Sequence, residues 1–256
     1  MIANLPMSAP HGARTNQLLA KLPLADFTPL EGHLERVQLR LGDVIHKPGQ
    51  RLLHAYFPTT AVVSLHCLMA SGSSSEMAGI GNEGMVGFAL TMGADITTSS
   101  AAVQIAGEAY RLDASVFKRE FEKLGPLHRL MLLYAQILIT QIGQSVACNR
   151  HHSIEQQLCR WFLLTLDRQG TAEFVMTQDL VANTLGVRRE SITVAATKLQ
   201  QAGVIRYRRG HISVLDRERL ETRACECYAA VKDETSRLMA VDLGQRNTAC
   251  ARTEKE

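Results

Sequence analysis

The chain has 256 residues, with 46% hydrophobic residues, 21% charged residues and a formal net charge of +3 at pH 7. Such a composition is typical of one or two globular domains and excludes a disordered or fibrous protein. No segment approaches the roughly 18 uncharged apolar residues of a membrane span, and residues 1–24 lack the pattern of a secretion signal. We therefore expect a cytoplasmic protein that has no membrane partner.

The first part of the chain is predicted to be a β-roll. No lysine or arginine occurs between Arg51 and Arg111, and short β-prone runs such as 61–68 alternate there with glycines. Many short strands separated by turns are typical of a barrel or roll. We expect this domain at residues 18–125, after a flexible N-terminus at residues 1–17.

A long helix is predicted from Pro126 to about Cys148, because proline fits the first turn of a helix. Its apolar residues spread too widely for one stripe, so two faces of the helix need cover. One face can pack on the roll and the other on the same helix of a second subunit, as in a symmetric dimer; burial inside a monomer is the alternative. We expect a dimerisation helix at 126–150. The predicted interface residues are Leu130, Tyr134, Ile137, Leu138 and Ile142.

The last part of the chain carries a helix-turn-helix pattern from Gln178 to Thr197. Ala182 is the small residue where two helices cross, and Gly186 lies in the turn, where a left-handed backbone costs glycine least. Two alternating runs within 203–214 then predict a hairpin that forms a wing. The segment therefore predicts a winged helix-turn-helix.

The charge of this domain suits DNA. From Gly186 to His211, six basic residues stand against a single acid, Glu190. In such motifs the N-terminal end of the second helix enters the major groove, and a basic wing suits phosphates; a structural hairpin with solvated charges is the alternative. We expect the DNA-binding domain at 151–232 and a flexible tail at 233–256. The predicted DNA-binding residues are Thr177, Gln178, Arg188, Arg189, Glu190, Ser191, Thr193, Lys198, Arg206, Arg208 and Arg209.

The six cysteines lack the dense spacing of a disulfide scaffold, and we expect reduced thiols. Cys225 and Cys227 are close enough in sequence to form a redox pair or to contribute to a metal site. Since no His or Cys lies beside them at ligand spacing, the sequence predicts no metal site. His151 and His152 could sense pH or bind a metal, and we expect a solvated hinge there.

These segments together resemble the Crp/Fnr superfamily, the cyclic-AMP receptor and fumarate-nitrate regulators, over about residues 18–232. The resemblance lies in Lys47–Pro48–Gly49, in Glu83–Gly84–Met85–Val86–Gly87, in the long helix and in residues 176–214. It implies an α+β protein with an N-terminal double-stranded β-helix (a jelly roll of the cyclic-nucleotide-binding type), a long dimerisation helix and a C-terminal winged helix-turn-helix.

The resemblance also implies a function. A Crp/Fnr-type protein is a sequence-specific transcription regulator, not an enzyme, that binds a palindromic operator in double-stranded DNA as a homodimer and contacts RNA polymerase at promoters. The first residues of its recognition helix read bases, which corresponds here to Arg189 and Glu190. Val194 replaces the arginine that many members carry one turn further on, so the half-site should differ from the familiar one.

The chain departs from the family where cyclic nucleotides bind. Met85 stands at the position of the glutamate that holds the ribose, and Ser99 at that of the arginine that holds the phosphate. A buried phosphodiester would lack a cation here, so we expect an effector other than cyclic AMP, or none. The polar residues predicted for an effector pocket are Ser99, Ser100 and Gln104. No cysteine precedes Cys67, which argues against the family's iron–sulfur cluster.

The sequence disfavours two other classes of function. An enzyme would need a catalytic motif, and no phosphate-binding loop, nucleophile elbow or zinc-protease motif occurs in the sequence. Gly79–Ile80–Gly81–Asn82–Glu83–Gly84 has the spacing of a dinucleotide-binding motif but lies in a β-region, where we expect turns. A cyclic-nucleotide-responsive signalling subunit without DNA binding is disfavoured by the basic winged domain.

Overall fold

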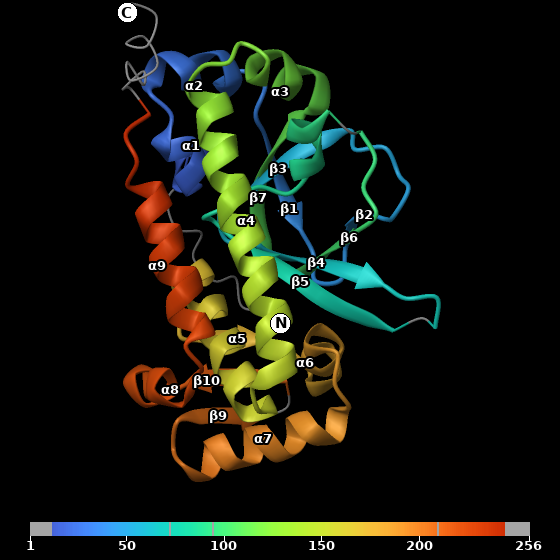
Figure 1. The fold of residues 1–256 in the computed structure, drawn as a ribbon, viewed down its shortest axis with the longest axis vertical. Coiled ribbons are helices and arrows are strands. Elements are labelled where there is room, and N and C mark those ends of the chain that lie inside the picture. Colours follow the sequence, from blue (N-terminus) through green and yellow to red (C-terminus); the bar gives the residue numbers. More distant parts are fainter. Residues whose placement is uncertain (1–11, 72, 94, 209, 244–256) are drawn as a thin grey trace, which may run out of the picture.

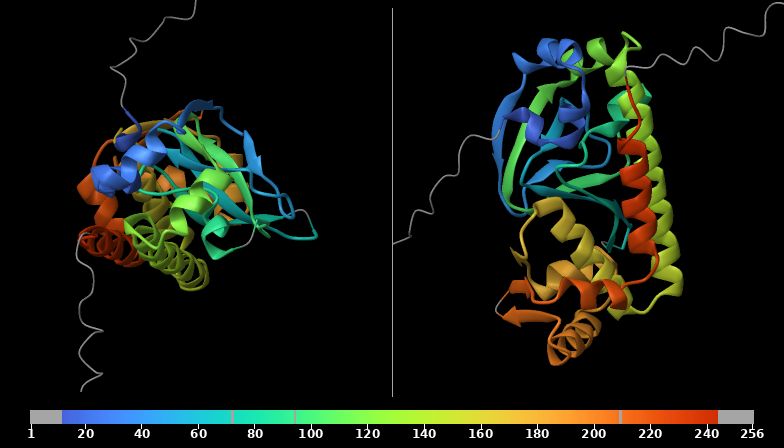
Figure 2. Two further views of the ribbon diagram at one scale, coloured as in Figure 1. Left: turned by 90° about the horizontal axis from the view of Figure 1, so that it is seen from above. Right: turned by 90° about the vertical axis from the view of Figure 1, so that its left-hand side faces the viewer.

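The computed structural model describes residues 12–243, apart from residues 72, 94 and 209. A β-roll occupies one end of the molecule and a smaller domain with a three-stranded sheet occupies the other (Figure 1). Helices α4 (Pro126–His151) and α9 (Cys227–Met239) lie side by side along both parts (Figure 2).

The elements follow one another along the chain in two groups. The roll and its flanking helices comprise η1 (Ala13–Thr15), α1 (Gln17–Lys21), α2 (Leu24–Glu31), β1 (Glu35–Leu39), β2 (Val44–His46), β3 (His54–Pro58), β4 (Val62–Leu68), β5 (Ser74–Ile80), η2 (Phe88–Met92), β6 (Ser100–Ile105), β7 (Gly107–Asp113) and α3 (Ala114–Phe121). Between α4 and α9 lie α5 (Ile154–Gln169), β8 (Glu173–Val175), α6 (Gln178–Leu185), α7 (Arg189–Gln201), β9 (Ile205–Arg208), β10 (His211–Val214) and α8 (Arg217–Arg223).

The roll consists of two antiparallel sheets, with strand orders β1-β7-β3 and β2-β6-β4-β5. Strands β6 and β7 follow each other directly in sequence but belong to different sheets, which joins the two sheets at one corner. Small and β-branched side chains fill the space between the sheets, among them Val63, Val103 and Ala109. The expected α+β fold, with an N-terminal roll, a long helix and a C-terminal winged helix-turn-helix, is confirmed.

The glycine-rich segment after β5 serves close packing. A side-chain carbon on Gly81 would lie 2.5 Å from Cβ of Arg168, and one on Gly79 would lie 2.6 Å from its guanidinium. A carbon on Gly84 would lie 2.5 Å from the hydroxyl oxygen of Tyr134. The expectation that these glycines serve turns was therefore incomplete, because they also make room for two side chains from α4 and α5.

One face of α4 is buried against the roll and α9. Leu130, Tyr134, Ile137 and Leu138 are all at most 5% exposed within the protomer. The hydroxyl of Tyr134 accepts a hydrogen bond from the backbone N–H of Met85 at 3.0 Å and donates one to its carbonyl at 3.1 Å, and burial raises the pKa of this phenol. These four residues were predicted to contact a second subunit, and that choice of face was wrong because the protomer's own core covers them.

Helix α4 as a whole is unusually apolar. An 18-residue window reaches a mean hydropathy of 1.4, so by length and composition alone the helix could cross a membrane. The sequence-based expectation that no segment approaches such a length of apolar residues underestimated this helix. Its packing on β5 and α9 is typical of a core helix with one uncovered face.

The predicted boundaries differ from the structure at both ends of the chain. Asn16, in the expected flexible N-terminus, is fully buried and caps α1 by accepting from the N–H of Leu18. The expected flexible tail begins inside α9, and beyond that point Leu238 and Leu243 are buried against the roll's core. Residues 1–11 and 244–256 lie outside the described residues.

The C-terminal domain docks directly on the roll. Arg168 on α5 donates from Nε to the carboxylate of Glu83 at 2.9 Å, and both side chains are largely buried. Gln104 on β6 donates to Thr184 on α6 at 3.2 Å and to Glu76 on β5 at 3.1 Å. Gln104 was predicted to line an effector pocket, and it instead joins the roll to the C-terminal domain.

We expect Gly81→Ala to lower the free energy of unfolding by about 1–3 kcal/mol, because Cβ would overlap the stem of Arg168, which cannot swing away without breaking its ion pair. Urea denaturation measures the change. Gly32→Ala is the matched control, since apart from its chain neighbours no heavy atom of the described residues lies within 4 Å of its Cβ position and its φ is −66°, so we expect a change within about 0.5 kcal/mol. Equal stability of the two variants would contradict the packing argument.

Candidate DNA-binding surface

Helix α6 begins and ends with residues that fix its geometry. The side chain of Thr177 accepts a hydrogen bond from the N–H of Leu180 at 3.2 Å and thereby caps the helix. Gly186 ends the helix with a φ of +66°, the left-handed conformation that favours glycine. The turn that follows carries the chain into α7 at Arg189, with Arg188 as the exposed N-cap residue.

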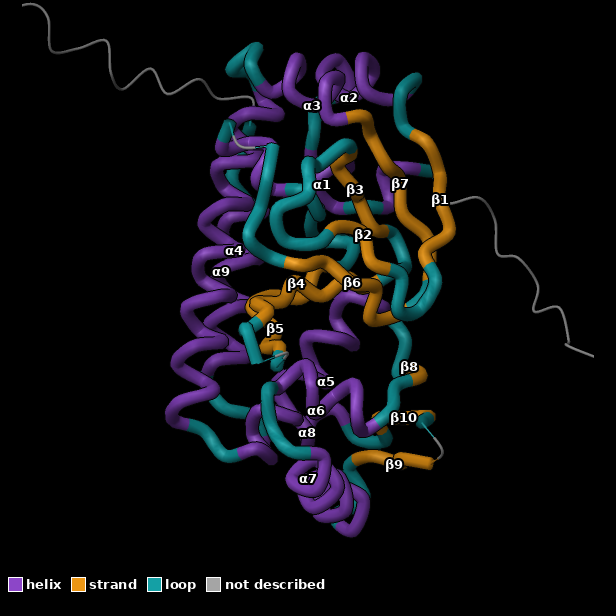
Figure 3. The backbone as a smooth tube through the Cα atoms, turned by 90° about the vertical axis from the view of Figure 1, so that its right-hand side faces the viewer, coloured by secondary structure: helices purple, strands orange, loops and turns teal. Residues whose placement is uncertain are grey.

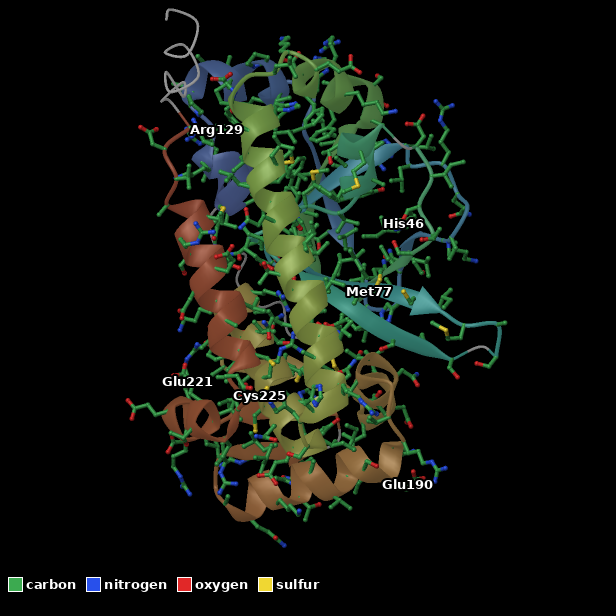
Figure 4. All side chains as sticks on the ribbon, in the orientation of Figure 1. His46, Met77, Arg129, Glu190, Glu221 and Cys225 are labelled. Atoms are coloured by element: carbon green, nitrogen blue, oxygen red, sulfur yellow. The ribbon has the colours of Figure 1, made fainter. Side chains whose placement is uncertain are left out.

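Helix α7 lies at the end of the molecule that is remote from the roll (Figure 1). Its inner side is buried in the domain core through Ile192, Ala195, Ala196 and Leu199. The opposite side is exposed along its whole length and begins with Glu190, which Figure 4 labels at the outer edge of the molecule. The helix therefore presents a solvent-facing surface that no other part of the described chain covers.

Polar side chains of α6 and α7 contact each other at the start of this surface. A guanidinium nitrogen of Arg189 lies 3.4 Å from a carboxylate oxygen of Asp179, with 61% and 62% of the two side chains exposed. The hydroxyl of Thr193 donates to Gln178 at 2.8 Å. An ion pair this exposed is worth little in water, so Arg189 is held near the surface and can exchange its carboxylate for another partner.

The predicted residues do not all lie on the centre of the exposed side. Ser191 is half-buried, and Lys198 lies beside a hollow between α7 and the start of α5 that is also lined by Glu155. The centre includes Thr197, which was not predicted and whose hydroxyl donates to the carbonyl of Thr193. Its position one helical turn after Thr193 is the sequence signal that could have found it.

The wing is a three-stranded antiparallel sheet with the order β8-β10-β9 (Figure 3). Strand β8 was not predicted, because its three residues are too short to show a period. Arg206 and Arg208 alternate with inward residues and are exposed. Tyr207 points inward and donates to the carbonyl of Met176 at 2.8 Å, and burial raises its pKa to about 12. Arg209 lies outside the described residues.

Comparison with known proteins identifies the domain that carries this surface. Residues 156–223 match the model of the Crp-like helix-turn-helix domain. The chain is a DNA-binding transcription regulator with a Crp-like helix-turn-helix domain. No curated protein sequence matches it significantly.

Three solved structures illustrate the shared fold. A protein from Eubacterium rectale described as a transcriptional regulator of the Crp/Fnr family is 19% identical, with 80% of this chain and 96% of that chain covered and a TM-score of 0.63. FixK2 from Bradyrhizobium japonicum is 14% identical, with coverage of 75% and 98% and a TM-score of 0.59. The c-di-GMP-responsive regulator CLP of Xanthomonas campestris is 13% identical, with coverage of 75% and 99% and a TM-score of 0.59.

The structure has a cavity of about 230 Å³ between the roll and α4. Most of its lining is apolar, and no described residue that lines it is a lysine or arginine. His46 is the buried polar group: neither ring nitrogen has a hydrogen-bond partner within the described chain, and burial lowers its pKa. Ser99 lines the cavity, whereas Ser100 does not; the hydroxyl of Ser100 donates to the carbonyl of His46 at 3.3 Å.

We expect Arg189→Ala and Glu190→Ala each to cost about 1–3 kcal/mol of binding at the preferred DNA site and to relax the preference at particular bases. Arg208→Ala should weaken binding to all sequences alike and reduce the salt slope by about one unit, as for a lost phosphate contact. Fluorescence anisotropy with preferred and scrambled duplexes at several salt concentrations separates the two effects. Arg119→Ala, on α3 at the opposite end of the molecule, is the control and should change neither. Unchanged affinity and base preference in both α7 variants would show that α7 does not enter the major groove.

Proposed function

We propose that this regulator acts in the cytoplasm as a homodimer that binds an inverted-repeat operator and contacts RNA polymerase at promoters. The proposal extends to the predicted DNA-binding residues, with α7 in the major groove and the wing on the phosphates. The observation that supports it is the combination of an exposed, basic winged surface with an uncovered apolar face on α4. As a Crp/Fnr-type regulator, the protein acts by binding DNA and not by catalysis.

The apolar residues on the uncovered face of α4 are spaced as in a helix–helix contact. Leu132, Ile139 and Val146 follow one another at intervals of seven residues and are 58%, 66% and 68% exposed. Ile142 lies beside this row and is half-buried. A repeat of seven is the spacing at which two helices pack along their length, and a copy of the same helix has the matching surface. The proposed interface is therefore Leu132, Ile139, Ile142 and Val146.

A two-fold dimer sets the geometry of the operator. Two copies of α7 related by a dyad read two inverted half-sites whose centres lie about one helical turn, roughly 10–11 base pairs, apart. The site is accordingly palindromic. A cyclic-nucleotide signalling subunit without DNA binding would have no use for such a surface, and the match to a helix-turn-helix domain disfavours that alternative.

We expect the double variant Leu132→Glu/Val146→Glu to be monomeric in light scattering, because four charges would meet across the dyad in an apolar seam. It should also lose the preference for an inverted repeat over a single half-site. Leu53→Glu, at a roll residue that is 62% exposed, is the control and should remain dimeric. Ile137 and Leu138 are unsuitable positions, since glutamate there would disrupt the protomer's own core. If the double variant stays dimeric, this face of α4 is not the dimer interface.

The cavity suggests the class of effector. Its apolar lining favours an uncharged small molecule, and the unpartnered ring of His46 can give or accept one hydrogen bond. Ser99 is the second polar group of the proposed pocket. A cyclic nucleotide would leave its phosphate without a cation in this site.

We expect no binding of cyclic AMP at micromolar concentration in isothermal titration calorimetry, because burial lowers the pKa of His46 and leaves the ring uncharged at pH 7. Ser99→Ala is the companion variant, and it should give the same flat titration. Tight binding by the native protein that disappears in Ser99→Ala would place the phosphate in this pocket after all.

A further inference from the structure

Four potential metal ligands converge where α4 ends and α9 begins. They are Cys148 and His152 at the end of α4, and Cys225 and Cys227 at the start of α9. Their ligand atoms all lie within 4.8 Å of one another. Figure 4 labels Cys225 beside the end of α4 that lies next to the C-terminal domain. The sequence predicted no metal site, because Cys148 and Cys225 are 77 residues apart and only the fold brings them together.

Two of the separations match those around one tetrahedral ion, and the others are at most 4.8 Å. Sγ of Cys148 lies 3.5 Å from Sγ of Cys225, and Sγ of Cys227 lies 3.6 Å from Nδ1 of His152. With metal–sulfur bonds of about 2.3 Å and metal–nitrogen bonds of about 2.0–2.1 Å, a tetrahedron places its ligand atoms about 3.5–3.8 Å apart. The three cysteines are at most 5% exposed, so the group is closed to solvent on the sulfur side.

The histidine is oriented as a metal ligand would be. Its Nδ1 faces the sulfur atoms, and its Nε2 lies 3.2 Å from the carboxylate of Glu226. A carboxylate on the second ring nitrogen fixes the tautomer and raises the basicity of a ligating imidazole. The backbone N–H of His152 donates to the carbonyl of Cys148 at 3.0 Å, which holds these two residues together at the helix end.

A buried cation without an acidic partner lies next to the cysteines. Arg160 on α5 is 6% exposed, and its charge acts on the thiols of Cys148 and Cys227. It donates to the hydroxyl of Ser145, its Nε has no hydrogen-bond partner, and it forms no ion pair with a carboxylate within the described residues. Three thiolates around a divalent ion carry a net charge of about −1, which this guanidinium would balance.

We propose that Cys148, His152, Cys225 and Cys227 bind one Zn²⁺ ion per protomer as a closed, structural site. Three thiolates and one imidazole complete the tetrahedron and leave no open position for a substrate. The ion would link the end of α4 to the start of α9 beside the first turn of α5, and so would hold the DNA-binding domain at a fixed orientation to the long helix. An iron–sulfur cluster would require ligand sulfurs further apart, because the cluster itself lies between them.

Elemental mass spectrometry of the full-length protein, purified under reducing conditions, tests the proposal. We expect one zinc per protomer in the native protein and in Cys67→Ser, the control at a half-buried cysteine on β4. Cys148→Ser and Cys225→Ser should lose the metal. Replacing zinc by Co²⁺ should produce thiolate-to-cobalt charge transfer and the visible bands of a tetrahedral ion in the native protein and in Cys67→Ser, and in neither Cys148→Ser nor Cys225→Ser.

Two further variants test the site without removing a thiol. His152→Cys supplies a fourth thiolate and should keep the zinc, whereas Glu226→Gln should weaken zinc binding about tenfold in competition with a chromophoric chelator. Equal zinc content in Cys225→Ser and Cys67→Ser would overturn the proposal. So would iron with inorganic sulfide, or a zinc-free protein that binds no cobalt and whose mass shows a Cys148–Cys225 disulfide.

Discussion

Helix α4 carries more apolar surface than one contact can cover, and the arrangement of the molecule follows from this excess. One face packs on the roll, where Tyr134 reaches the backbone of Met85, and a second contacts α9. The third face stays exposed, and near the end of the helix the buried Cys148 faces the start of α9. Because its faces differ in what they contact, a single helix lies beside the cavity, the proposed dimer seam and the C-terminal domain.

The domain that carries α7 is held to the roll by polar contacts made through buried groups. The Arg168–Glu83 ion pair is largely withdrawn from water, so removing either partner would leave a buried charge and cost about 3–5 kcal/mol. Gln104 ties β6 to α6 in the same interface. Such contacts are specific in geometry, and they fix the orientation of α7 relative to the strands that line the cavity.

The helix-turn-helix could be predicted because its pattern is local: the crossing alanine, the turn glycine and the inward apolar residues lie within one short segment. Contacts between segments that are distant in the sequence could not be predicted in this way. Periodicity showed that α4 has more than one apolar face but did not say that Ile137 faces inward and Ile139 outward. Gln104 was a plausible pocket residue until α6 was placed against β6, and Cys225 had no visible partner until α9 returned to the end of α4.

The length of α4 has a mechanical consequence. Its 26 residues span about 39 Å, with the cavity near the middle and the C-terminal domain at the far end. A tilt of the whole helix by about 5° against the roll shifts one end relative to the other by about 3.4 Å, the rise of one base pair along a DNA strand. A tilt of a few degrees would therefore be enough to shift the end of the helix by a distance on the scale of a nucleotide. It would also have to break the contacts of Arg168 and Gln104 that hold the C-terminal domain on the roll.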